Sequence, residues 1–280
     1  MIKSILVTLD GSEHSLTASR YAIWLAQRLQ ATVVGMHVVD VVSLEGSGAF
    51  LHDVSGSLGF EPYLDFSSKM RDALQERGKA IVDQFLAACT EAGVRADTLL
   101  STGIIANEIC EHARAADLVV VGHRGMNERF STGLLGGTTE SVTRKCPKPV
   151  LVCPEEFQPV TRPLLAYDGS PRAAAAMHEA AELATALGLP LTVLYVGKDD
   201  AATHRLLEES RRYLATHRVE SEYVIRPGYA NEVIVETIAA GQHDLLVIGA
   251  YGHSRIIEMV LGSTTEYVLR NASVPVFLCR

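Results

Sequence analysis

An internal repeat limits the possible folds of this chain more than any other feature of its sequence. Five blocks of the first half recur in the same order in the second half. The paired blocks are ILVTLDGS and PLLAYDGS, ANEI and ANEV, DLVVVGHRG and DLLVIGAYG, LGGTTESV and LGSTTEYV, and KPVLVC and VPVFLC. The repeat therefore predicts two domains of the same fold, residues 1–154 and 163–280, joined by a short linker that contains prolines.

Short Val/Ile/Leu-rich runs alternate in each copy with segments whose apolar residues recur at helical spacing, such as the helix expected over 69–92. Such strands are typical of a parallel sheet covered by helices on both faces. We therefore expect an α/β fold with two Rossmann-like domains, each a five-stranded parallel sheet flanked by helices. The last strand of each copy, near 149–153 and 275–279, is expected to pair across a pseudo-twofold axis, and a homo-oligomer is expected through these strands.

The first copy carries an extra segment, residues 41–68, which is rich in Gly and Ser and has no clear period. Two interpretations stay open for it. It is either a surface loop or a lid or partner-binding flap, because long loops in compact domains are often functional.

Composition excludes several classes of protein. Of the 280 residues, 48% are hydrophobic and 21% are charged, which is ordinary for a globular chain. The net charge of −8 argues against nucleic acid as a partner, and no apolar run approaches the roughly 18 residues of a membrane span. The N-terminal residues lack a signal-peptide pattern. The five cysteines contain no CxxC pair, so we expect no metal site and a reduced, cytoplasmic setting.

A glycine motif with the form Gly249-x2-Gly252-x9-Gly262-Ser263 follows the fourth strand of the second copy. Glycines permit left-handed turns and let the backbone approach a ligand, and the helix expected after Gly262 offers N–H groups to a phosphate. Asp168 ends the first strand. If the first and fourth strands are neighbours, a carboxylate and a phosphate loop share one crevice, as a nucleotide site requires.

Each of these residues also has a structural interpretation. Ser263 and Glu266 fit a helix capping box, in which the serine hydroxyl accepts a hydrogen bond from a helix N–H. Asp168 precedes Gly-Ser and fits a turn or helix cap. His123 and His253 are expected to be solvated loop residues, and His37 a satisfied strand residue.

The motif and the strand-end Asp168-Gly169-Ser170 resemble the universal stress protein family, specifically its tandem, ATP-binding members. The resemblance covers nearly the whole chain except 41–68. It implies that Asp168 contacts the ribose and that Val196 holds adenine through its backbone. It also places Gly249 against the ribose, with the phosphates surrounded by Gly252, Gly262, Ser263 and Thr264.

The first copy departs from this pattern in two ways. Ten residues instead of nine separate Gly125 from Gly136, and Gly137 stands in the position of Ser263. By resemblance its nucleotide-binding residues are Asp10, Val38, Gly122, Gly125, Gly136, Gly137 and Thr138. Alternatively, the extra residue between Gly125 and Gly136 reshapes the phosphate loop enough to prevent nucleotide binding.

The resemblance implies an ATP-binding stress protein that acts as a sensor or regulator with an unidentified protein partner. We identify no catalytic residue, so hydrolysis is expected to be slow or absent. A divalent metal such as Mg²⁺ is expected to bind mainly through the phosphates. Two alternatives remain, namely an ATPase or nucleotidyl-transfer enzyme and a nucleotide-free interaction scaffold.

Overall fold

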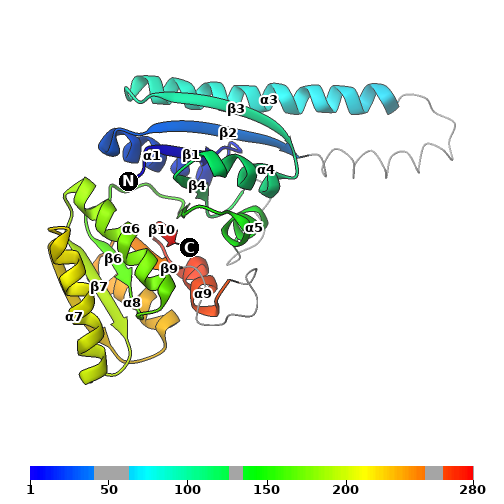
Figure 1. Cartoon of the computed structure of the whole chain (residues 1–280). Helices are drawn as coiled ribbons and strands as arrows, with labels where there is room; N and C mark the ends of the chain where they lie inside the picture. The colour runs from blue at the N-terminus through cyan, green and yellow to red at the C-terminus, as the bar shows by residue number, and fades with distance from the viewer. Residues whose placement is uncertain (41–62, 126–134, 250–260, 280) are drawn as a thin grey trace, which may run out of the picture.

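A computed structural model describes residues 1–40, 63–125, 135–249 and 261–279 (Figure 1). Strands and helices alternate through both halves, as the sequence predicts. The elements of the first half are β1 (Ser4–Thr8), α1 (Glu13–Leu29), β2 (Thr32–Asp40), α3 (Tyr63–Glu91), β3 (Ala96–Gly103), α4 (Ile105–His112), a 3₁₀ turn (Ala113–Ala115), β4 (Leu118–Gly122), α5 (Gly137–Lys145) and β5 (Val150–Cys153). Those of the second half are β6 (Pro163–Ala166), α6 (Pro171–Leu187), β7 (Leu191–Val196), α7 (Ala201–Thr216), β8 (Ser221–Arg226), α8 (Ala230–Gly241), β9 (Leu245–Gly249), α9 (Ser263–Asn271) and β10 (Val276–Cys279).

The strands form one sheet in the order β3-β2-β1-β4-β5-β10-β9-β6-β7-β8. Each half contributes five parallel strands, which confirms the predicted α/β fold class. The halves join where β5 and β10 pair antiparallel, with Leu151 opposite Phe277. The predicted pairing of the two terminal strands is therefore confirmed.

The same pairing corrects one expectation. β5 also pairs with β4, and β10 also pairs with β9, so both edges of both terminal strands are occupied within one chain. A homo-oligomer through these strands is therefore wrong as a route of assembly, because a strand needs a free edge to pair with another chain.

The central strands are apolar along their whole length because helices cover both faces of the sheet. Alternate residues of β4 enter two different buried clusters, with Val120 on one face and Val119 on the other. The first cluster receives side chains from α1, α3, α6 and α7, and the second from α4, α5, α8 and α9.

Helix α3 begins six residues before the predicted start at 69 and has 29 residues, whereas its counterpart α7 has 16. It extends past the ends of β2 and β3 in Figure 1. The last residues of the 41–68 segment are thus helical, and residues 41–62 lie outside the described part. Gly35 of β2 lets α3 approach, because a Cβ there would clash with the ring of Phe85.

The linker between the halves is packed against the first half. The hydroxyl of Thr17 donates to the carbonyl of Glu155 at 2.6 Å, and the ring of Tyr21 meets that of Phe157 edge to face at 4.7 Å between centroids. Val160 is buried in the core. These contacts hold the start of β6 in a defined position relative to α1.

Candidate functional site

The first and fourth strands of each half are neighbours, as a shared crevice requires. In the second half β6 pairs with β9, with Leu165 opposite Val247, and in the first half β1 pairs with β4. The strand order reverses at each of these pairs. In the second half, for example, the strand that follows β6 in sequence, β7, lies on one side of the pair, and the strand that follows β9, β10, lies on the other. Ligands of open parallel sheets bind beyond the carboxyl ends of strands at such a point of reversal.

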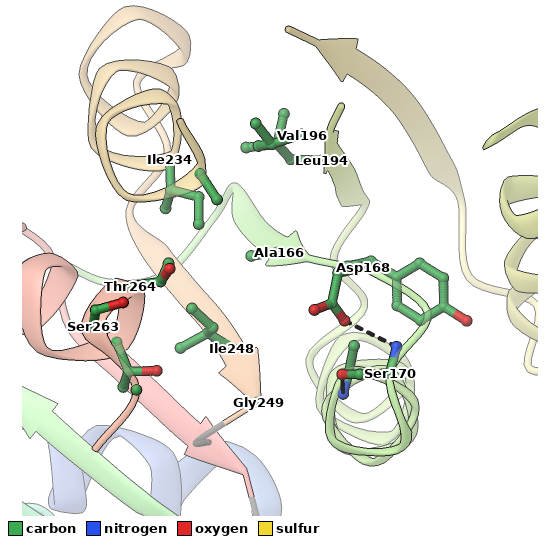
Figure 2. Close-up of a pocket in the computed structure, with 15 residues that line it drawn as sticks. Ala166, Asp168, Ser170, Leu194, Val196, Ile234, Ile248, Gly249, Ser263 and Thr264 are labelled. Carbon is green, nitrogen blue, oxygen red and sulfur yellow. Dashed lines mark hydrogen bonds between the residues drawn. The ribbon is translucent and has the colours of Figure 1, made fainter. Parts of the chain in front are cut away.

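A pocket of about 190 Å³ lies there in the second half (Figure 2). One part of it is apolar and includes Leu194, Val196 and Ile234. Another part is polar, with Asp168 on one side and Ser263 and Thr264 on the other (Figure 2). The remaining lining residues are Ala166, Tyr167, Ser170, Ala173, Ala230, Ile248, Gly249, Gly262 and Thr265.

Asp168 has a turn role as well as a place in the pocket. Its Oδ1 accepts a hydrogen bond from the backbone N–H of Ser170 at 2.9 Å, which is drawn in Figure 2. The Ser170 hydroxyl in turn accepts from the N–H of Ala173 at 3.1 Å and caps α6. The predicted turn is therefore present, and it orients the carboxylate at the pocket wall.

The alternative interpretation of Ser263 as part of a capping box is wrong. Gly262 is the N-cap residue of α9 and has no side-chain cap, so Ser263 is the first helical residue. Glu266, the other half of the predicted box, instead bonds to Arg270 at 2.6 Å. The start of α9 therefore presents backbone N–H groups and two hydroxyl side chains to the pocket, an arrangement suited to an anion.

The glycines of the motif serve the fold differently from the prediction. Gly262 has a φ of −61°, and Gly136, its counterpart, has a φ of −58°, so neither makes a left-handed turn. A Cβ on Gly249 would lie 2.7 Å from the backbone carbon of Arg172, so this glycine permits close packing against α6. Among the described glycines near the pockets, Gly11, Gly169 and Gly228 instead have positive φ angles.

Six of the seven residues predicted for the second half line this one pocket: Asp168, Val196, Gly249, Gly262, Ser263 and Thr264. Gly252 lies outside the described residues, as do His253 and Arg255. Sequence reasoning missed the apolar residues Leu194, Ala230 and Ile234. The signal available for them was their position at the end of one strand and the start of one helix.

The first half holds a smaller pocket, of about 90 Å³, at the equivalent place. It is lined by Thr8, Leu9, Asp10, Ser15, Met36, Val38, Ile105, Ile109, Val121, Gly122, Arg124, Gly125, Thr138 and Thr139. Of the predicted residues, Gly136 and Gly137 do not line it; they are the N-cap and the first residue of α5. Asp10 makes the same turn as Asp168, accepting from the N–H of Ser12 at 2.8 Å.

Two predictions for histidines have different outcomes. His37 is satisfied as expected, with Nδ1 at 2.6 Å from the carbonyl oxygen of Leu9. His123 is not a solvated loop residue, because its Nε2 lies 2.5 Å from the carbonyl oxygen of Leu269 in α9. The backbone N–H of His123 also donates to the carbonyl of Cys153 at 2.8 Å.

Neither a metal cluster nor a membrane span is evident in the described part of the chain. No group of three or more His, Cys, Asp or Glu residues there could hold a metal ion. No helix among the described residues is both long and apolar enough to cross a bilayer.

The fold and the two pockets define a class of protein with tandem Rossmann-like domains and a potential ligand site at the strand reversal of each. The family model described as "Universal stress protein family" matches residues 1–154 and 160–280. Universal stress protein Slr1230 of Synechocystis sp. is 30% identical over 289 residues, with 100% of both chains covered. The chain therefore belongs to the universal stress protein family.

Other similarities agree with this assignment. Universal stress protein MJ0531 of Methanocaldococcus jannaschii is 33% identical over 156 residues, covering 54% of this chain and 82% of that protein. Among solved structures, a universal stress protein from Archaeoglobus fulgidus has a TM-score of 0.76 at 22% identity, covering 99% of this chain and 98% of that one. At this identity the structural likeness supports the fold alone.

Proposed function

We propose that this chain binds an adenine nucleotide, ATP, in the second-half pocket and acts as a nucleotide-dependent sensor or regulator in a stress response. The observation that carries the proposal is the arrangement of Asp168 and the start of α9 around one pocket with an apolar end. A nucleotide has the three matching parts: an apolar base, a sugar with hydroxyl donors, and an anionic phosphate chain.

Each part of the nucleotide has proposed partners. Asp168 accepts from the ribose hydroxyls, and its hydrogen bond to Ser170 holds it ready to do so. The base lies against the apolar end, where Val196 holds adenine through its backbone, and Gly249 lies against the ribose. The phosphates lie at the start of α9, beside Gly262, Ser263 and Thr264, with Gly252 as a further proposed contact.

The proposal includes slow or absent hydrolysis. Asp168 is the only charged side chain among the described residues that line this pocket, and it is proposed to bind the ribose rather than the phosphates. Phosphoryl transfer usually relies on a positioned cation and a group that orients the attacking water. Mg²⁺ would neutralise the phosphates and is proposed to bind mainly through them. The reduced cysteines are consistent with a cytoplasmic setting, which we also propose.

Titration calorimetry with ATP and excess Mg²⁺ tests the proposal. Asp168→Asn keeps an oxygen for the turn but loses the charge, so we expect affinity to fall about tenfold or more. Asp97→Asn is the matched control, because exposed Asp97 lies on β3, the edge strand of the other half, lines neither pocket and should have no effect. With 2′,3′-dideoxy-ATP the Asp168→Asn penalty should largely disappear, since the sugar donors are gone.

The alternatives predict other outcomes. Turnover well above about 1 s⁻¹ with Mg²⁺ would indicate an enzyme, because most enzymes work at that rate or faster. No ATP bound at millimolar concentration, together with no co-purifying nucleotide by mass spectrometry, would indicate a nucleotide-free scaffold.

A further inference from the structure

The two pockets share one framework but differ in size, at about 190 Å³ in the second half and about 90 Å³ in the first. Both are lined by the ends of the first, second and fourth strands and by the starts of three helices. The difference therefore comes from particular side chains and not from a change of architecture.

One difference between the pockets lies in the helix at the apolar end. Ile105 and Ile109 of α4 line the first pocket, whereas Ala230 and Ile234 of α8 line the second. In both helices the two residues are four apart and so lie on the same face. The second residue of each pair is isoleucine in both halves, whereas the first is isoleucine in the first half and alanine in the second.

Ile105 in the first pocket and Ala230 in the second occupy equivalent positions because of the helix register and not because of the sequence repeat. The repeat ANEI and ANEV aligns two alanines, Ala106 with Ala230. The first hydrogen bonds of α4, however, run from Asn107 and Glu108 to the carbonyl of Ile104, at 2.9 and 3.0 Å. Those of α8 run from Glu232 and Val233 to the carbonyl of Tyr229, at 3.1 and 3.0 Å. Helix α4 thus begins one residue earlier within its repeat block, which places the isoleucine at the pocket.

Other lining positions differ as well, some larger and some smaller in the first pocket: Thr8 for Ala166, Ser15 for Ala173, Leu9 for Tyr167 and Val121 for Ile248. Met36 of β2 and Leu194 of β7 face the pockets at equivalent places, and each is about 1% exposed. Leucine and methionine have similar volumes. The polar end of the first pocket keeps Asp10, Thr138 and the cation of Arg124, all suited to a sugar and phosphates. At the apolar end, where the proposal places the base, Ile105 therefore occupies volume that Ala230 leaves open.

We infer that Ile105 is a size filter that keeps the base of an adenine nucleotide out of the first pocket, so that the native chain binds one nucleotide, in the second half. This inference rests on the proposed function and adds its stoichiometry and the residue that sets it. The first pocket then admits the nucleotide only when Ile105 is shortened. Five of the residues that were expected to bind nucleotide there line it: Asp10, Val38, Gly122, Gly125 and Thr138.

Reciprocal substitutions test the inference by calorimetric stoichiometry with ATP and Mg²⁺. The native chain should bind one nucleotide, and Ile105→Ala should bind two. Ala230→Ile should lose at least tenfold in affinity at the native site. The double variant should bind one nucleotide again, now in the first half, and adding Asp10→Asn should weaken that binding. Ile104→Ala is the matched control, because this neighbouring side chain is 54% exposed and does not line the pocket.

Thermal unfolding of each variant without ligand establishes that it is folded, and Ile105→Val provides a milder change if the alanine variant is not. Two equal sites in the native chain, or one site in folded Ile105→Ala, would overturn this inference and leave the proposed function standing. No site in either the native chain or Ile105→Ala would overturn the proposed function and this inference with it.

Discussion

The Nε2 of His123 donates a hydrogen bond to the carbonyl oxygen of Leu269 at 2.5 Å and so connects the two halves beside the first pocket. His123 directly follows Gly122, which lines the first pocket, and Leu269 belongs to α9, whose first residues line the second. The turn after β4, beside the first pocket, is thereby attached to α9, whose start lines the second pocket.

Replacing His123 should weaken the junction between the halves. His123→Ala removes a donor and leaves the carbonyl of Leu269 without this bond, so we expect the free energy of unfolding to fall by about 1–2 kcal/mol. His123→Gln offers an amide donor at a similar distance and should restore most of the loss. Urea denaturation of the three proteins measures this, and equal midpoints for all three would contradict the role of the bond.

Two aspartates at equivalent places in the repeat, Asp244 and Asp117, fix the starts of β6 and β1. Asp244 accepts from the N–H and hydroxyl of Thr161, at 2.7 and 2.5 Å, and from the N–H of Arg162 at 2.7 Å. Asp117, its repeat counterpart, accepts from the N–H groups of Lys3 and Ser4 at 2.8 and 3.0 Å.

Asp244→Ala should lower the free energy of unfolding by about 1–3 kcal/mol, because charged hydrogen bonds to backbone N–H groups are lost. Asp117→Ala should cost somewhat less, since it loses fewer bonds. Asp97→Ala on the exposed edge strand β3 is the control and should change stability little. Chemical denaturation ranks the three variants, and a larger loss in the control would refute the assignment.

Tyr21 should make stability depend on pH in the alkaline range. Burial raises the pKa of its phenol to about 12, from an ordinary value of 10. Between these values the unfolded chain loses the proton while the folded chain keeps it. The stabilising contribution is therefore complete below pH 10 and is lost as the pH rises to about 12, a change of about 2–3 kcal/mol.

The Tyr21→Phe variant isolates this effect, because other groups that titrate in this range are common to both proteins. Unfolding free energies at pH 9 to 12 should fall more steeply for the native chain than for the variant. Parallel curves would show that the phenol titrates normally.

The cysteines should differ in reactivity toward a thiol reagent. Cys89, Cys146, Cys153 and Cys279 are buried, and Cys110 is half-buried. Burial raises the pKa of the Cys89 thiol to about 11 and those of Cys153 and Cys279 well above 9. At pH 8 we expect iodoacetamide to label Cys110 in the folded protein and all five in denaturant, as read by peptide mass spectrometry. Rapid labelling of Cys153 in the folded state would contradict the packing at the junction of the halves.

Much of the fold follows from local sequence signals. The strand-end Asp168 and the turn after it are predictable because an aspartate two residues before a serine N–H can accept its hydrogen bond. The capping box at Ser263 failed for an equally local reason, since Gly262 already holds the N-cap position and moves the serine into the helix. The solvated loop assigned to His123 failed because its partner, Leu269, lies far away in sequence.

The repeat and its alternating strands determined the fold class, because hydrophobic periodicity and turn chemistry depend only on neighbouring residues. They also placed Asp168 and Gly249 at the ends of the first and fourth strands of the second copy, and the structure showed that these two strands are adjacent. Tertiary structure alone decided that the predicted pairing of β5 with β10 leaves neither strand a free edge for another chain. It also decided that Ile105 faces the first pocket where Ala230 faces the second. Both outcomes depend on contacts and side-chain volumes between distant segments, which no local pattern contains.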